Sequence, residues 1–217
     1  VRIPKNFSHL VDHKEGTRTD GFVSFIDFGP TILNLAGIDL PIFMDGKPFI
    51  GEGVKSNDLS KRDEVYCYAD RFDEKYDLVR TVRKGKWKYI RNYQGFYPDG
   101  LQNNYRYRML AYQEWRELFN AGKLNDKQSQ FFRPRPAEQL FDLSVDPHEV
   151  NDLSSKPQFK KNLLELRSKL KQQMVEMNDL SLYPESYMIE NALGDPLAFG
   201  NSKNEEIKSL IEIADLA

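Results

Sequence analysis

The most regular pattern of apolar and polar positions covers residues 156–178 and predicts a long amphipathic helix. Its apolar positions recur every three or four residues and therefore fall on one side of a helix: Phe159, Leu163, Leu166, Leu170, Met174 and Met177. Ser155 is placed to cap this helix, and Pro157 suits its first turn. The remaining sides carry mostly Lys, Glu, Gln and Asn. We expect the apolar side to lie across one face of a sheet.

The segments before this helix are rich in β-branched and aromatic residues and predict a small antiparallel sheet of about four strands. The predicted strands are residues 64–69, residues 78–83 and 86–93 as a hairpin, and residues 139–143. Lys84 and Gly85 form the hairpin turn, where glycine suits a positive φ. A helix is expected over residues 109–121. Together these elements predict an α/β chain whose local organisation is α+β.

A second apolar segment, residues 22–38, predicts a short and deeply buried helix. Asp27 is placed at its N-terminus, Pro30 suits its first turn and Gly37 its C-terminal cap. The apolar positions cover most of the circumference of this helix: Ile32, Leu33, Leu35 and Ala36. Because an ordinary surface helix is apolar on one side only, we expect this helix to sit inside a larger body.

Composition and charge exclude several classes of protein. Hydrophobic residues make up 40% of the 217 residues and the formal net charge is −2, so the chain should fold and shows no electrostatic signature of nucleic-acid binding. No apolar run is long enough to span a bilayer. The single cysteine, Cys67, excludes an internal disulfide, and we interpret it as a buried strand thiol.

One charged run stands out as a candidate binding site. It lies between two predicted strands, in a segment expected to be a loop, and contains Arg71, Asp73, Glu74, Asp77 and Arg80. Arginine there can pair with an anionic group of a ligand, and the acidic residues can accept hydrogen bonds from ligand hydroxyls. The alternative is a solvated loop whose charges neutralise one another.

Four segments, in this order, resemble the formylglycine-dependent sulfatases of the alkaline-phosphatase superfamily. They are residues 23–38 (VSFIDFGPTILNLAGI), residues 44–49 (MDGKPF), residues 79–93 with the hairpin VRTVR and WKYIRNY, and residues 138–153 (EQLFDLSVDPHEVNDL). Each segment alone is a weak signal, but their order and spacing together are specific. The resemblance covers about residues 1–185, and residues 70–77 look closest to heparan N-sulfatase-like bacterial glycan sulfatases.

The resemblance implies that this chain is the C-terminal portion of such an enzyme. Residues 1–60 would then end a large catalytic α/β domain, residues 61–180 would form a C-terminal antiparallel subdomain, and residues 181–217 would be a helical extension of unknown role. The partner of this chain would be the preceding catalytic domain of the same polypeptide, with a sulfated small molecule or glycan as substrate. We expect both ends of the chain to be cuts, and a periplasmic or secreted location if it is like its family.

The residues that carry sulfatase chemistry are expected outside this chain. The resemblance implies a formylglycine nucleophile, made from Cys or Ser in a Cys/Ser-x-Pro-x-Arg motif, and a calcium ion held by oxygen ligands. Cys67 has no Pro or Arg at the required offsets, and His9 and His13 are four residues apart but precede a glycine-rich turn. We therefore expect no catalytic residue, metal ligand or cofactor in this chain, and no activity alone.

Two other functions are compatible with the sequence. The chain could be a non-catalytic module that binds glycans or other anions, with heparin-type affinity that depends on Arg71 and Arg80. It could also belong to a phosphodiesterase or phosphonate hydrolase of the same superfamily. The nucleophile motif expected upstream of Val1 distinguishes these possibilities. A sulfatase would have the Cys/Ser-x-Pro-x-Arg motif there, whereas a phosphodiesterase or phosphonate hydrolase would have a plain Thr or Ser.

Overall fold

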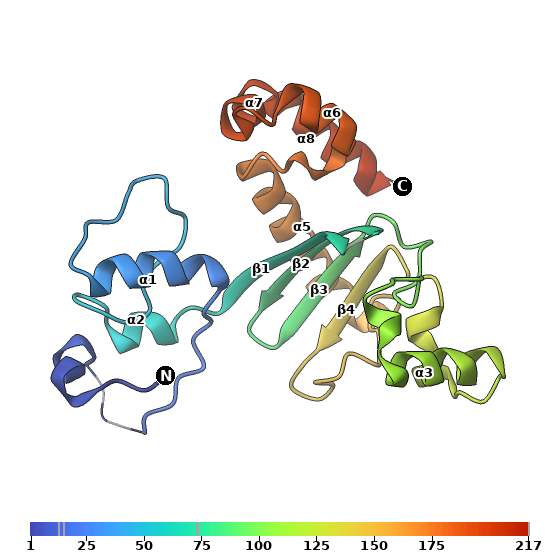
Figure 1. Ribbon diagram of the computed structural model, residues 1–217, viewed down its shortest axis with the longest axis horizontal. Coiled ribbons are helices and arrows are strands. Elements are labelled where there is room, and N and C mark those ends of the chain that lie inside the picture. Colours follow the sequence, from blue (N-terminus) through green and yellow to red (C-terminus); the bar gives the residue numbers. More distant parts are fainter. Residues whose placement is uncertain (13, 15, 73, 217) are drawn as a thin grey trace. The chain divides into compact units, whose positions relative to one another are not determined.

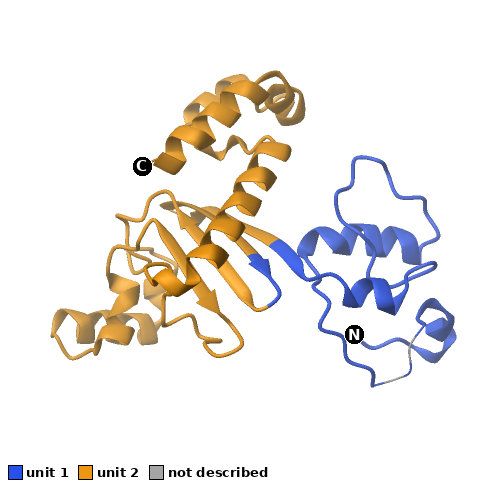
Figure 2. Ribbon diagram, turned by 180° about the vertical axis from the view of Figure 1, so that it is seen from behind, with its two compact units in different colours: residues 1–65, 83–85 blue, residues 66–82, 86–217 orange. Residues whose placement is uncertain are grey.

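The computed structural model describes residues 1–12, 14, 16–72 and 74–216. Its contacts divide the chain into two compact units (Figure 2). The first unit contains residues 1–65 and 83–85, and the second contains residues 66–82 and 86–217. The assignment of the first unit to a larger catalytic domain stays a prediction.

The strands form one four-stranded antiparallel sheet in the order β1-β2-β3-β4 (Figure 1). Their bounds are β1 Glu64–Phe72, β2 Lys75–Lys84, β3 Trp87–Asn92 and β4 Glu138–Asp142. The register of β3 and β4 places Tyr89 opposite Leu140, two side chains that are both buried. The turn between β2 and β3 falls on Gly85 and Lys86, one residue later than predicted, with Gly85 at φ +53°. The predicted sheet is confirmed.

Helix α5 (Lys160–Glu176) covers one face of this sheet and closes the core of the second unit. Of its predicted apolar side, Leu163, Leu166, Leu170 and Met174 are buried, whereas Met177, just after the helix, is 59% exposed. The buried residues pack in one cluster with side chains of β2, β3 and β4: Val82, Tyr89 and Leu140. The helix begins later than expected, because Pro157 opens a 3-10 turn instead and Ser155 caps nothing. The prediction of a sheet covered by a long helix is confirmed.

Polar contacts at the edge of the core hold α5 in register on the sheet. The hydroxyl of Tyr89 donates to the carboxylate of Glu138 at 2.5 Å, and Arg167 of α5 pairs with both oxygens of that carboxylate. Burial opposes the charge of Glu138, but the hydrogen bonds from Arg167 and Tyr89 outweigh it and lower the pKa of this carboxyl. Burial and the hydrogen bond to Glu138 raise the pKa of Tyr89, so its hydroxyl keeps its proton.

The last part of the chain completes the core of the second unit. Its helices are α6 (Glu185–Asn191), α7 (Pro196–Ser202) and α8 (Asn204–Leu216). Ile207 and Ile211 of α8 are fully buried in the cluster beneath α5. The guanidinium of Arg91 in β3 donates to the carbonyl of Ala214 at 2.7 Å. The segment for which the sequence indicated no role is therefore part of the packed core.

A helical segment rich in aromatic residues connects β3 to β4. It contains α3 (Leu110–Asn120), which matches the helix predicted at residues 109–121, and α4 (Asp126–Ser129). Trp115 stacks on Phe131 at 4.5 Å between ring centroids, and Phe119 stacks on Phe132 at 4.7 Å. These ring pairs give the insertion a small core of its own.

The first unit contains the helices α1 (Phe28–Leu35) and, near its C-terminal end in the sequence, α2 (Ser56–Ser60). Asp27 precedes α1 as predicted, and Gly37 follows it at φ +68°. The carboxylate of Asp27 accepts from the backbone N–H of Ser24 and of Lys47, each at 2.9 Å. The hydroxyl of Thr31 accepts from the N–H of Phe49. The side chains of Asp27 and Thr31 therefore hold the loop that contains Lys47 and Phe49 against α1.

Two expectations concern burial. Ile32 and Leu35 of α1 are exposed in this chain, and the burial of this helix inside a larger body stays a prediction. The expectation of a buried thiol was wrong, because Cys67 is exposed in β1, an edge strand of the sheet. None of the helices in the described part of the chain has the length and apolar character that crossing a membrane requires.

A pair of substitutions in α5 tests the packing of this core. We expect Leu170→Ala to lower the free energy of unfolding by about 2–5 kcal/mol, because a buried Leu is removed and a cavity remains. Leu164→Ala, on the same helix and 44% exposed, is the matched control and should cost well under half as much. Urea unfolding of the two variants at neutral pH measures both values. Equal losses would contradict the assigned helix face.

Candidate functional site

The charged run predicted as a loop is mostly a β-hairpin. Arg71 lies in β1, Asp77 and Arg80 lie in β2, and only a short turn near Glu74 joins the strands. The strands extend further than predicted because the charged side chains find partners on neighbouring elements, so polarity did not mark a loop here. Asp73, the fifth predicted residue, lies outside the described residues.

Arg80 is buried and sits between two carboxylates. Its Nε and Nη2 donate to the two oxygens of Asp179 at 2.6 and 2.9 Å, and its Nη1 donates to Asp70 at 2.6 Å. The guanidinium also lies 5.5 Å from the ring centroid of Tyr68. Asp179 follows the end of α5, so this contact joins β2 to the chain that leaves the helix. Arg80 is therefore committed to structure and is not placed to bind a substrate anion.

The charges of this pair stabilise each other in a buried setting. Burial disfavours the Arg80 cation, but the hydrogen bonds from Asp179 and Asp70 outweigh it and raise its pKa. Burial likewise disfavours the Asp179 carboxylate, yet the hydrogen bonds and charge of Arg80 lower its pKa below the usual value. Both groups are ionised together, and removal of either would leave an uncompensated buried charge.

Asp77 belongs to a second ion-pair cluster on the opposite face of β2. Its carboxylate pairs with Arg135 and accepts from Lys75 at 3.1 Å, and both cations also contact Asp99. Burial opposes the charge of Asp77, but the hydrogen bonds from Arg135 and then Lys75 lower its pKa. The ammonium of Lys75 is almost completely buried. Asp77 thus holds the strand to the loop before β4 and does not point to a ligand.

Glu74 and Arg71 are the exposed members of the run among the residues that the structure describes. Hydrogen bonds from its own backbone N–H and from that of Asn104 lower the pKa of Glu74. Arg71 makes a two-pronged pair with Glu185, and its guanidinium carbon lies 5.7 Å from the ring centroid of Tyr76. Both members of this pair are about half exposed. A carboxylate already occupies the position that another anion would need.

A shallow cleft of about 460 Å³ lies beside this pair in the second unit. It is bordered by β1, β2 and the chain that follows α5, and it is lined by Arg71, Tyr76, Leu78, Gln94 and residues 181–186. Two of these lining residues contact each other, because the hydroxyl of Tyr76 donates to the carbonyl of Ser181 at 3.2 Å. Arg71 is the predicted residue that reaches this cleft. Glu185 and Gln94 were missed, since no motif or periodicity marks either position.

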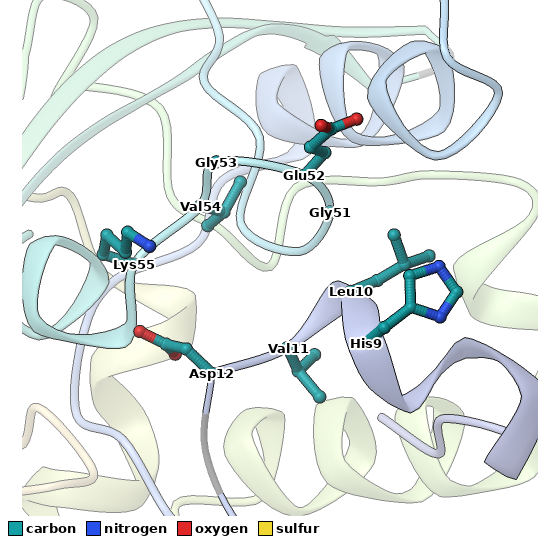
Figure 3. Close-up of a pocket in the computed structure, with 9 residues that line it drawn as sticks. All are labelled: His9, Leu10, Val11, Asp12, Gly51, Glu52, Gly53, Val54 and Lys55. Atoms are coloured by element: carbon teal, nitrogen blue, oxygen red, sulfur yellow. The ribbon is translucent and has the colours of Figure 1, made fainter.

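A second cavity, of about 340 Å³, lies in the first unit. Figure 3 shows its lining, which comes from the 3-10 turn Lys5–Leu10 with the two residues after it, and from the loop before α2. Asp12 is engaged there, because both of its oxygens accept from the N–H of Ser56. His9 lines this cavity, whereas His13 lies outside the described residues. Among the residues that are described, no three His, Cys, Asp or Glu side chains are grouped to hold a metal ion.

The lowered pKa of Asp179 makes a prediction about pH. A depressed carboxyl pKa stabilises the fold above the unfolded-state value of about 4, and this contribution is lost as the pH falls below it. We expect Asp179→Asn to cost about 3–5 kcal/mol at neutral pH, and the difference from the wild type to shrink below about pH 4. Urea unfolding across this range measures it. Asp126→Asn, at an exposed pair, is the control and should change little. A loss for Asp179→Asn that stays constant with pH would contradict the ionised pair.

Curated relatives of this chain are sulfatases. An ulvan-active sulfatase of Formosa agariphila is 39% identical over 171 residues, which is 77% of this chain and 28% of the relative. A second ulvan-active sulfatase of that organism is 25% identical over 156 residues, 68% of this chain and 28% of the relative. The chain therefore spans less than a third of the relatives that it matches. No family model matches it.

The solved structures that resemble this chain include proteins named as sulfatases. A 2-O GAG sulfatase matches 70% of this chain and 25% of its own length, with 20% identity and a TM-score of 0.43. A protein described in complex with its substrate D-glucosamine-2-N,6-O-disulfate matches 71% and 25%, with 17% identity and a TM-score of 0.45. The sequence relationship to the curated proteins carries the assignment, and the short match fits the C-terminal portion that the motifs predicted. This chain therefore belongs to the sulfatases, and its match covers 28% of the length of the 39%-identical relative.

Proposed function

We propose that this chain is the C-terminal region of a sulfatase that hydrolyses sulfate esters or N-sulfate groups of a glycan or a similar anion. The single observation that supports this most is the 39% identity over 171 residues with an ulvan-active sulfatase. A sulfated polysaccharide is the substrate class that this relative suggests.

The reaction itself belongs, in this proposal, to the part of the enzyme that the chain does not span. The described residues include no group that could hold a metal ion, and Cys67 lacks the sequence context of a formylglycine precursor. We therefore expect the formylglycine nucleophile and calcium in the preceding region. The chain alone should have no sulfatase activity.

The contribution of this chain would be a substrate contact at the cleft beside Arg71. A guanidinium that binds a carboxylate through two parallel hydrogen bonds offers the same geometry to a sulfate or uronate group. Tyr76 adds an aromatic surface next to that guanidinium. Glu185 would then be exchanged for a substrate anion. Arg80 and Asp77, which are locked in ion pairs, would hold the hairpin that carries Arg71.

The proposed activity is tested on the longer polypeptide that contains this chain, produced with formylglycine maturation. Released sulfate is measured with ulvan and with a heparin-type glycosaminoglycan, and the isolated chain is measured in parallel. We expect sulfate release by the longer protein only. Turnover by the isolated chain would contradict the proposal that the catalytic groups lie in the region that this chain does not span. Hydrolysis of a phosphodiester to a phosphomonoester and an alcohol, without release of sulfate, would instead favour the phosphodiesterase alternative.

The contact assigned to Arg71 makes a separate prediction for the same enzyme. Loss of a charge-assisted hydrogen bond costs about 1.5–3 kcal/mol, so Arg71→Ala should raise KM by about 10- to 100-fold with little change in kcat. Arg133→Ala, at an exposed pair with Asp126, is the matched control and should leave KM unchanged. Steady-state kinetics of both variants measure the effect. An unaltered KM for Arg71→Ala would remove this residue from the binding site.

A further inference from the structure

Three exposed aromatic rings lie in the segment that runs from the end of β3 to α3. They are Phe96, Tyr97 and Tyr105, with exposed fractions of 65%, 40% and 66%. We call them the aromatic platform. The rings that form the small core of this connection are different ones, and they stack on one another. The platform therefore has no part in filling that core.

The segment that carries these rings begins at the cleft beside Arg71. Gln94 lines the cleft, and the N–H of Tyr97 donates to the carbonyl of Gln94 at 3.1 Å, which folds residues 94–97 into a turn. Phe96 is two residues beyond Gln94, so their Cα atoms are at most about 7 Å apart. The rings of Phe96 and Tyr97 contact each other, with 4.5 Å between their centroids. The first two rings of the platform therefore lie at the rim of the cleft.

The third ring is held by the hairpin of β1 and β2. The N–H of Asn104 donates to the carboxylate of Glu74, at the turn of that hairpin, at 2.5 Å. Tyr105 is the residue after Asn104, and Tyr76, which lines the cleft, is two residues after Glu74. The hairpin that supplies Arg71 and Tyr76 to the cleft therefore also holds the backbone that carries Tyr105.

The wall of the cleft contains a strained residue, and such strain is concentrated at functional sites. Leu78 of β2 is buried and has φ +47°, in the left-handed region that bulky residues avoid. Its carbonyl accepts from the N–H of Tyr93 at 3.1 Å, and Tyr93 begins the segment that continues to Gln94 and Phe96. The strained backbone therefore fixes where this segment leaves β3, and with it the place of the platform.

The chemistry of the platform favours sugar rings as its ligand. The face of an aromatic ring is negative and attracts the C–H groups of a sugar, while a tyrosine hydroxyl can reach the hydroxyl groups at the sugar's edge. Near Tyr105 in the chain, the exposed amides of Gln102 and Asn104 can donate to and accept from hydroxyl groups. A cleft of about 460 Å³ suits a small ligand, so a longer glycan bound there would extend beyond it, to the platform at its rim.

We propose that the aromatic platform binds the sugar units next to the one whose anionic group contacts Arg71. This inference rests on the proposed function and goes beyond it, because it makes the length of the glycan part of its recognition. A polymer would reach both the cleft and the platform, whereas a short fragment would occupy the cleft alone. The enzyme should therefore bind a long glycan more tightly than its fragments.

Binding measurements on the longer polypeptide that contains this chain test the proposal. The protein is produced without formylglycine maturation, so that a glycan is bound but not hydrolysed, and Kd is measured by isothermal titration calorimetry. The ligands are ulvan and a heparin-type glycosaminoglycan, each as the polymer and as its disaccharide. We expect Phe96→Ala and Tyr105→Ala each to raise the Kd of the bound polymer by about 2- to 10-fold and to leave that of its disaccharide unchanged.

Two further variants serve as controls. Tyr105→Phe keeps the ring and loses the hydroxyl, so it should retain most of the affinity for the polymer. Phe7→Ala removes a ring of the first unit that is 51% exposed, and it should change the Kd of neither ligand. The melting temperature of each variant is measured as well.

Several results would overturn the proposal. Unchanged affinity of both alanine variants for the polymer, or no binding of either polymer by the wild type, would show that the platform is not a glycan site. Equal losses for polymer and disaccharide would assign the rings to the cleft itself. A melting temperature several degrees below that of Phe7→Ala would show that another part of the polypeptide covers them. Sulfate release by the matured wild type is measured separately, so failure of the platform is distinguishable from failure of the proposed function.

Discussion

The second unit depends on the compensation of one buried positive charge. The guanidinium of Arg80 in β2 is buried, where an unpaired cation would be strongly destabilising. Asp179 and Asp70 supply the matching negative charges. Because Asp179 follows α5, this pair determines where the chain goes after the helix. The segment that lines the cleft at Arg71 starts there. The position of the candidate binding site is thus a consequence of charge balance in the interior.

Local pattern was sufficient to predict the elements whose burial is periodic. The apolar side of α5 and the alternation in β3 follow from 3.6- and 2-residue periods, and Gly85 marked the hairpin turn within one residue. The extension of β1 and β2 was not predictable in this way. Charged residues there resemble a solvated loop until their partners are known. The role of α8 was hidden for a related reason, since Ile207 and Ile211 meet the core only through tertiary packing.

The candidate site shows the same division between local and distant information. The charged run at residues 71–80 indicated a ligand site, but Arg80 pairs with a carboxylate 99 residues away and Asp77 with an arginine 58 residues away. Residue type and spacing describe which charges are present, whereas the structure decides which are already neutralised. Among the described residues of the run, Arg71 lines the cleft and has a partner, Glu185, that is half exposed. The motif segments did identify the family, because their order along the chain does not depend on contacts.

The position of α8 has a consequence for the order in which the protein is made. Ile207 and Ile211 are buried in the same core cluster as the apolar side chains of α5, and the carbonyl of Ala214 accepts a hydrogen bond from the guanidinium of Arg91. During synthesis, the sheet and α5 leave the ribosome before α8 does, with this part of their apolar surface still open to water. The second unit can therefore reach its final packing only after α8 has emerged. A nascent chain stalled before α8 would present that surface to chaperones and proteases.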